Sequence, residues 1–261
     1  MNVSETDRRR QIANELRERL GELLADHDRA DAVTEALRVV RAHEVDIPTL
    51  YVDVLTPLMA DVGVGWQKNL MCVWEEHLAS AAVRTIVDAL YPRVLELKLA
   101  ADPTSRKVLL ACPPDEAHDL GLRMLSDLFD IAGWDTYLLG ADVPTAEIAD
   151  AAAQLGVDLV VLTSATHFHR VRIRHIVELL HARVPGVRVV IAGAAYAKDT
   201  QGLADDEVFR AAEFFGPSDT HAAAAAGGAT VATDGTADAP PAEVPAPAPR
   251  KRKKRPPKEG G

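Results

Sequence analysis

The feature that most constrains the fold is a series of short apolar runs that alternates with amphipathic segments after residue 106. The apolar runs cover residues 108–111, 136–139, 159–162 and 187–191, with 213–215 as a candidate for a short fifth. The amphipathic segments between them cover residues 120–132, 144–155, 171–183 and, more weakly, 205–210. Strands that are apolar throughout are buried on both faces, and intervening helices bring such strands into parallel pairs. This half of the chain therefore predicts a Rossmann-like parallel sheet covered by helices.

The first hundred residues show helical periodicity instead. Apolar side chains recur at helical spacing, with charged residues between them, over residues 12–24, 28–44, 47–62 and 71–91. Pro48 suits the first turn of the third helix. Gly63 and Gly65 are expected to end that helix, because glycine adopts the left-handed conformation of a helix C-cap at little cost. Four amphipathic helices with short connections predict a four-helix bundle.

The change in pattern divides the chain. We predict a helical bundle over residues 1–101, a linker at 102–105 and an α/β domain over residues 106–226. Residues 227–261 are rich in alanine and proline and have few large apolar side chains, so this tail is expected to be disordered. A solubilising role for the tail is favoured over contact of its basic run, 250–255, with nucleic acid, an acidic partner or a membrane surface.

Composition excludes several classes of protein. The net charge is −10, and segment 221–261 carries 7 Lys/Arg against 4 Asp/Glu, which leaves about −13 on residues 1–220. Such an acidic body is a poor general binder of phosphate backbones. Cys72 and Cys112 form no CxxC pair, and the polar residues 1–10 do not resemble a signal peptide. No apolar run approaches the roughly 18 residues of a membrane helix, so a cytoplasmic protein without membrane contact is expected.

The first apolar run is followed by a polar loop with the sequence Glu116-Ala117-His118-Asp119-Leu120-Gly121. In open α/β sheets, ligands bind at the carboxyl ends of the strands, where this loop is expected. The imidazole of His118 offers one ring nitrogen to a metal, and Glu116 is placed to hold the other nitrogen and fix the tautomer. Gly121 removes a side chain where a bulky group passes close to the backbone. By spacing alone, a helix cap or a polar loop residue is the commoner role for such a histidine.

Four landmarks, in order over residues 106–226, resemble the cobalamin-binding domains of the methionine synthase and methylmalonyl-CoA mutase type. Those domains carry a D/E-x-H-x-x-G loop after the first strand and Leu-Gly-x-Asp-Val-Pro after the second. A Ser/Thr-rich turn follows the third strand, and a Gly-Gly pair follows the fourth. The matching residues are Glu116, His118 and Gly121; 139–144; 162–166; and Gly193 with Ala194, where the second glycine is replaced.

The resemblance implies roles for these residues. In such domains the histidine displaces the cofactor's own benzimidazole and binds cobalt from below. His118 is therefore the implied lower axial ligand, Glu116 is its orienting partner, and Asp119 and Gly121 belong to the same cofactor loop. Without His118, the remaining matches are ordinary turn residues at strand ends. With it, the freed nucleotide tail is expected between the third and fourth strands, against Thr163, Ser164, Gly193 and Ala194.

The helical half carries a second resemblance. Trp66 is followed, after nine residues, by Glu76 and His77, a spacing similar to that of the light-sensing adenosylcobalamin proteins of the CarH type. There the tryptophan caps the adenosyl side of the cofactor, and the Glu and His contact the adenosyl group. An indole covers an apolar face, while a carboxylate and an imidazole form hydrogen bonds with ribose and adenine. Unaided, Trp66 is interpreted as a core residue and His77 as an ordinary polar one.

Two departures from the CarH type shape the expectation. Proteins of that type carry an N-terminal winged-helix DNA-binding domain, whereas this chain begins with the bundle, so direct operator binding is not expected. They also place a histidine next to the tryptophan, where this chain has Gln67. Water or another ligand, rather than a second histidine, is therefore expected on cobalt after photolysis.

The missing DNA-binding domain also makes the chain similar to the photocobilins, which combine cobalamin with a bilin such as biliverdin. Histidines often contact bilins, and several gather in one region, although clustered histidines are more often solvated. Nothing around Cys72 argues for bilin attachment. The histidines concerned are His167, His169, His175 and His181.

The sequence thus favours an adenosylcobalamin-binding light sensor. Cleavage of the cobalt–carbon bond would change bundle packing, self-association or the binding of a separate signalling partner. The alternative is a corrinoid methyl carrier for separate methyltransferases, which shares the bundle and the histidine loop. The spacing of Trp66 from Glu76 and His77 suits a bulky adenosyl group better than a methyl group. No catalytic triad, P-loop or zinc-ligand spacing is present, so no enzymatic turnover is predicted.

Overall fold

The computed structural model describes residues 5–196, 200 and 203–215. Within them a helical region precedes a four-stranded parallel sheet, which confirms the predicted bundle and Rossmann-like domain. The predicted disordered tail, 227–261, lies outside the described residues.

Two helices of the bundle begin at aspartate caps that the sequence supplies. The Asp28 side chain accepts a hydrogen bond from the Asp31 amide, and Asp46 accepts one from the Thr49 amide at 2.8 Å, ahead of Pro48. These bonds satisfy amides that the first helical turn leaves unpaired. The elements are α1 (Glu5–Ala25), α2 (Arg29–Arg41), α3 (Ile47–Thr49), the π-helical η1 (Leu50–Leu55), α4 (Thr56–Gln67) and α5 (Val73–Ala100).

The predicted end of the third helix is wrong. Gly63 and Gly65 both lie inside α4, which continues to Gln67. The left-handed residue that follows is Asn69, at a φ of 55°, and the Leu70 amide closes the turn on the Gly65 carbonyl at 2.9 Å. Asparagine adopts this conformation because its short polar side chain bonds locally, so the glycines are not needed as the stop.

The predicted end of the fourth helix at Tyr91 is also wrong. α5 passes through Pro92 and ends at Ala100. Val94 is fully buried and Leu97 is half-buried against the same core, so the packed face continues beyond the proline. Most helical stability in proteins comes from such packing rather than from local propensity, which explains why the proline does not end α5.

The sheet has the order β2-β1-β3-β4, and all neighbouring strands are parallel. Val108 of β1 lies opposite Thr136 of β2 on one side and Leu159 of β3 on the other. The central strands β1 and β3 therefore end side by side, at the edge where α/β sheets bind ligands. The elements are β1 (Lys107–Ala111), α6 (Leu120–Ile131), β2 (Asp135–Gly140), α7 (Thr145–Leu155), β3 (Leu159–Thr163), α8 (Arg170–Arg183) and β4 (Arg188–Ala192).

A helix, α9 (Ala211–Phe215), stands where the sequence offers a candidate fifth strand. Phe214 and Phe215 pack against Phe129 of α6, with ring centroids 5.6 and 5.0 Å apart. Burial of these aromatic rings favours the helix over an added strand. The helix predicted just before it is a single 3₁₀ turn, Asp205–Glu207.

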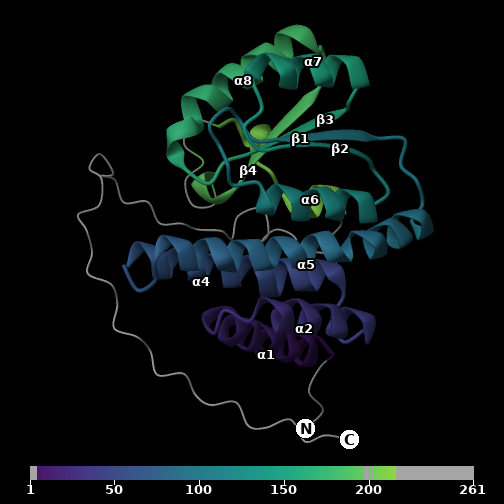
Figure 1. The fold of residues 1–261 in the computed structure, drawn as a ribbon. Coiled ribbons are helices and arrows are strands. Elements are labelled where there is room, and N and C mark those ends of the chain that lie inside the picture. Colours follow the sequence, from purple (N-terminus) through teal and green to yellow (C-terminus); the bar gives the residue numbers. More distant parts are fainter. Residues whose placement is uncertain (1–4, 197–199, 201–202, 216–261) are drawn as a thin grey trace, which may run out of the picture.

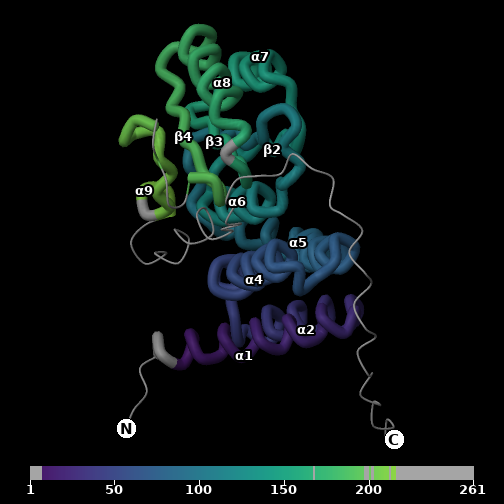
Figure 2. Tube along the Cα trace, turned by 90° about the vertical axis from the view of Figure 1, so that its left-hand side faces the viewer, coloured from purple at the N-terminus to yellow at the C-terminus, as the bar shows by residue number. Residues whose placement is uncertain are grey.

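The elements are stacked in layers (Figures 1 and 2). α7 and α8 cover one face of the sheet, α6 covers the other, α5 lies along the outer side of α6, and α1 and α2 lie beyond α5. One apolar cluster runs from the bundle through α6 into the sheet. Polar contacts cross the same boundary: Tyr51 Oη donates to Asp127 at 2.7 Å, and Lys98 Nζ pairs with Asp130 at 2.7 Å. The amino-terminal part of α5 extends past the start of α6 on the side where the strands end.

One helical stretch, Ile47–Gln67, is long and apolar enough to cross a membrane by length and composition: it has 21 residues, and an 18-residue window within it has a mean hydropathy of 1.3. The stretch is not an unbroken apolar run, because Asp53 and Asp61 lie within it. Half of the stretch is buried inside the protein, and Leu50, Tyr51 and Leu55 are fully buried. Packing in the bundle core accounts for its apolar character.

Candidate functional site

The loop between β1 and α6 is held by its neighbours at the same edge of the sheet. Asp115 has a left-handed backbone, at a φ of 64°, and its amide donates to the Asp142 side chain at 2.8 Å. The Asp142 amide donates to the Glu116 carbonyl at 3.0 Å, and Arg172 of α8 pairs with the Asp115 carboxylate at 2.6 Å. The β2–α7 loop and α8 therefore fix the segment that presents Glu116 and His118.

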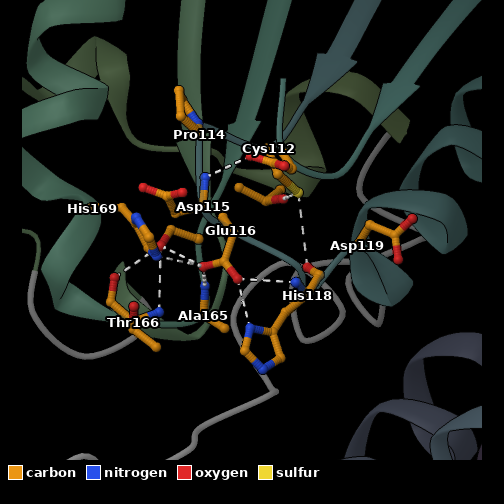
Figure 3. A network of polar contacts seen from close by, with 12 residues as sticks. Cys112, Pro114, Asp115, Glu116, His118, Asp119, Ala165, Thr166 and His169 are labelled. Carbon is orange, nitrogen blue, oxygen red and sulfur yellow. Dashed lines mark hydrogen bonds and ion pairs between the residues drawn. The ribbon is translucent and has the colours of Figure 1, made fainter. Parts of the chain in front are cut away.

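Glu116 and His118 form a close pair (Figure 3). Nδ1 of His118 lies 2.6 Å from Oε1 of Glu116, which also accepts the His118 amide at 3.0 Å. The other carboxylate oxygen accepts bonds from Ser164 Oγ and the Ala165 amide, both at 2.9 Å. Glu116 is buried, whereas 68% of the His118 side chain is exposed. The pair thus engages Nδ1 and leaves Nε2 on the exposed ring as the nitrogen for an incoming ligand.

Burial and hydrogen bonds set the charges of this pair. Burial alone raises the pKa of Glu116, but the bonds from the His118 ring, the His118 amide and the Ala165 amide outweigh it and lower the pKa to about 2. The hydrogen bond to Glu116 raises the pKa of His118 despite partial burial. Glu116 is therefore ionised at neutral pH. A metal at Nε2 competes with a proton, so metal binding is expected to weaken in acid.

Thr163 and Ser164 lie at the end of β3, beside Gly193 at the end of β4, as predicted. The Ser164 amide donates to the Ala192 carbonyl at 3.2 Å, and the Thr163 hydroxyl lies 3.4 Å from the sulfur of Cys112. Gly193 has a φ of 101°, and a Cβ there would lie 2.4 Å from the Ser164 carbonyl oxygen. Glycine is therefore required for the two strand ends to approach this closely.

The residues present fit the cobalamin that the resemblance implies. His118 exposes a nitrogen whose ring orientation Glu116 fixes, and a Cβ added at Gly121 would meet nothing within 4 Å. Ala194, beyond Gly193, is only half-buried. Within the part of the chain that the structure describes, the hydroxyl of Thr166 is buried without a hydrogen-bond partner. A buried hydroxyl of this kind is suited to a polar group of a ligand.

Asp119, a predicted cofactor contact, forms ion pairs with two helices. Arg84 of α5 pairs with one carboxylate oxygen at 2.7 Å, and Arg123 of α6 pairs with the other at 3.0 Å. Burial raises the pKa of Asp119, but the two guanidinium groups outweigh it and lower the pKa overall. Both oxygens are thus engaged within the protein, and Asp119 ties the loop to two helices.

Trp66, Glu76 and His77 lie where α4 ends and α5 begins. Trp66 is 43% exposed, so it is not a core residue. Glu76 accepts a hydrogen bond from Ser80 at 2.5 Å, and its other oxygen lies 3.3 Å from Nδ1 of His77. The charge of Glu76 also contributes to the raised pKa of His118, after the larger effect of Glu116. The start of α5 and the histidine loop therefore share one electrostatic environment.

His169 joins the site in a role that the sequence did not reveal. It is buried, and its Nε2 lies 3.6 Å from Oε2 of Glu116 (Figure 3). The only sequence signal is its place in the histidine-rich segment that suggests a bilin. That segment does not come together as one group: His175 and His181 are exposed on α8, and the side chain of His167 lies outside the described residues.

Gly193→Ala is expected to destabilise the cofactor-free protein by about 2–3 kcal/mol, because the new methyl group meets backbone atoms and the positive φ is strained. Gly121→Ala is the matched control, since its Cβ enters open space near the start of α6, and its free energy of unfolding should change by less than about 1 kcal/mol. Urea unfolding followed by circular dichroism measures both. Equal stabilities for the two variants would contradict the close approach at Gly193.

Family models match both halves of the chain. Residues 106–225 match a model described as "B12 binding domain", and residues 16–91 match a second model with the same description. The first match to begin along the chain ends inside α5, and the second begins just before β1, where the structure changes from helices to sheet.

Curated relatives come from two kinds of protein. The chain is 31% identical to the HTH-type transcriptional repressor CarA of Myxococcus xanthus over 61% of this chain and 51% of that protein. It is 29% identical to the repressor CarH of the same organism, over 68% of this chain and 55% of that protein. The chain thus spans about half the length of these relatives. A corrinoid protein of Desulfitobacterium hafniense is 19% identical over 63% of this chain and 76% of its own length.

One solved structure supports the architecture. The monomethylamine corrinoid protein of Methanosarcina barkeri superposes with a TM-score of 0.60 and 17% identity, over 69% of this chain and 85% of that chain. At this identity the likeness concerns the fold. Together, the family matches and the relatives support a cobalamin-binding module similar to that of CarA and CarH.

Proposed function

We propose that this protein is an adenosylcobalamin-dependent light sensor of the CarH kind, and that His118 binds the cobalt of the cofactor. The observation that carries the proposal is the exposed His118 ring, with its Nδ1 fixed by Glu116, at the sheet edge over which the start of α5 extends. When bound, adenosylcobalamin supplies a cobalt–carbon bond that light cleaves. The similarity to CarA and CarH supports the sensory role.

Two sets of residues would contact the two faces of the cofactor. Glu116 orients His118 and is itself held by Ser164, so the lower face is preorganised. On the upper face, Trp66 offers an exposed indole for apolar coverage, and Glu76 offers hydrogen-bond acceptors. A ligand that contacts both faces favours one arrangement of bundle against sheet. Loss of the adenosyl group, which Trp66 and Glu76 would contact, would then shift the equilibrium toward another arrangement of bundle and sheet.

The readout of this shift is proposed to be self-association or the binding of a separate signalling partner. Residues 1–220 are strongly acidic, which disfavours binding to the phosphate backbone of DNA, so we do not propose operator DNA as that partner. Two free cysteines suit a reducing compartment, and we propose that the protein acts in the cytoplasm.

A corrinoid methyl carrier is the second candidate. It is favoured by the match to the Desulfitobacterium corrinoid protein, which extends over 76% of that protein. A carrier needs the lower face but has no use for an adenosyl-sized upper site, so the two candidates differ in their preference for methylcobalamin over adenosylcobalamin.

Trp66→Ala tests the upper face. It is expected to weaken dark binding of adenosylcobalamin by roughly five-fold, equivalent to about 1 kcal/mol of aromatic contact, while methylcobalamin binding is unchanged. Trp74→Ala is the control, because Trp74 is similarly exposed but its ring contacts that of His27, with centroids 5.2 Å apart. Equilibrium dialysis in the dark measures the affinities, and gel filtration before and after green light measures association. Equal loss for both cofactors, or no light-dependent change in the parent protein, would favour the carrier.

A further inference from the structure

A buried carboxylate joins the histidine loop to the bundle. Asp119 follows His118 directly, and only 7% of its side chain is exposed. Arg84 Nη2 donates to Oδ1 at 2.7 Å, while Arg123 Nε donates to Oδ2 at 3.0 Å. Charge-assisted bonds to a carboxylate that is shielded from water are stronger than those of an exposed pair. The link is therefore well suited to fix the position of the loop.

Arg84 belongs to the same face of α5 as Glu76, a candidate upper-face residue. Glu76, Ser80 and Arg84 are spaced four residues apart, which places their side chains along one side of a helix. Ser80 bonds to Glu76, so this row is ordered. Two turns of helix separate Glu76 from Arg84, about 12 Å at 1.5 Å per residue. One continuous helix thus carries both the proposed cofactor contact and the ionic link to the loop.

At the other end of the loop, the contacts of Asp115 do not involve the bundle. Asp115 is held by Asp142 and Arg172, which both belong to the α/β domain. The amino-terminal end of the loop therefore follows the sheet, and the carboxy-terminal end, next to His118, is bonded to α5. A relative movement of α5 and the sheet acts on the backbone between these two anchors, which includes His118.

We propose that Arg84 is a positioning residue for His118: through Asp119, it couples the position of α5 to the position of the His118 ring. This inference rests on the proposed function, because it assigns the coupling between the two faces of the same site. Coupling of this kind is reciprocal, so occupation of the upper face stabilises the histidine loop, and binding at His118 stabilises the position of α5.

The test compares Arg84→Met with Lys98→Met. Lys98 of α5 and Asp130 of α6 form an ion pair with the same 2.7 Å separation and an equally buried carboxylate, but away from the histidine loop. Hydrogen exchange is measured first on the cofactor-free proteins. In Arg84→Met, the amides of His118 and Asp119 are expected to exchange about ten-fold faster, while Lys98→Met leaves them unchanged. Arg84→Lys, which keeps the charge, should restore much of the protection.

The loaded proteins provide the second readout. The fraction of cob(II)alamin with a protein nitrogen on cobalt, measured by electron paramagnetic resonance, should fall in Arg84→Met and stay at the parent level in Lys98→Met. Equal exchange and equal spectra for the two methionine variants would overturn the role of Arg84. A parent protein without any nitrogen from the protein on cobalt would overturn the proposed function instead, and the exchange comparison would still decide whether Arg84 holds the loop.

Discussion

Replacing His118 with alanine is expected to remove the protein ligand from cobalt and to weaken cobalamin binding by at least about 100-fold. Loss of a residue that only orients a metal ligand typically costs 10–100-fold in affinity, so loss of the ligand itself should reach or exceed the upper limit. Fold stability should change less than affinity, because 68% of the His118 side chain is exposed and the main interaction lost is its hydrogen bond to the buried Glu116. Dark titration with adenosylcobalamin, followed by absorption, measures the affinity.

Glu116→Gln tests the same site without removing the histidine. Ser164 Oγ and the Ala165 amide would keep one side-chain oxygen as their acceptor, which turns the new amide NH₂ toward Nδ1 of His118. Nδ1 then becomes the acceptor and Nε2 carries the proton, which is the wrong tautomer for binding metal. We expect a loss of about 10–100-fold in affinity without loss of the histidine. Full affinity in both variants would show that cobalamin does not use this loop.

Asp127→Asn is expected to remove a large pH dependence of stability. Asp127 is buried between α5 and α6, accepts the Tyr51 hydroxyl at 2.7 Å and lines a groove of about 480 Å³ together with Asp88 and Asp130. Burial raises the pKa of Asp127 to about 7; the Tyr51 hydrogen bond and Arg123 oppose this effect, and Asp130 and Asp88 add to it.

The direction of this pH dependence follows from the proton affinity of Asp127 in the folded and unfolded states. The folded protein binds a proton at Asp127 more tightly than the unfolded chain, whose aspartates titrate near 3.9, so the stability of the parent protein falls as pH rises from about 4 to about 7. At 1.36 kcal/mol for each pH unit, the loss approaches about 4 kcal/mol. The asparagine variant keeps the acceptor for Tyr51 and should gain up to that amount relative to the parent at pH 8, but not at pH 4.

Urea unfolding at pH 4 to 8 measures the difference between the two proteins, so that groups common to both cancel. Tyr51→Phe provides an opposite control. It removes a hydrogen bond that lowers the pKa of Asp127, and the fall in stability should therefore extend to higher pH. A constant difference between the parent and Asp127→Asn across this range would show that Asp127 is ionised throughout.

Much of the fold is readable from local patterns. The strands β1, β3 and β4 are apolar at nearly every position because they are buried on both faces, so each stands out in the sequence. The errors occur where tertiary packing decides. Val94 keeps α5 helical beyond Pro92, and the contact of Phe215 with Phe129 makes α9 a helix rather than a strand.

The candidate site likewise contains contacts that the sequence predicts and contacts that it does not. Glu116 and His118 are two residues apart in one loop, so their pairing at 2.6 Å can be anticipated from the motif. The contacts of Glu116 with Ser164 and His169 join positions about fifty residues apart, and Arg84 reaches Asp119 from another helix. No local signal marks such partners, because the topology of the sheet and the packing of α5 on α6 bring them together.

The central claim is that His118 itself binds cobalt. The most direct measurement is electron paramagnetic resonance of cob(II)alamin bound to uniformly ¹⁵N-labelled protein, with the cofactor left unlabelled. We expect a doublet splitting from a ¹⁵N imidazole of the protein, which disappears in His118→Ala. A triplet splitting would mean that the cofactor's own ¹⁴N benzimidazole remains on cobalt, and it would contradict the assignment of His118.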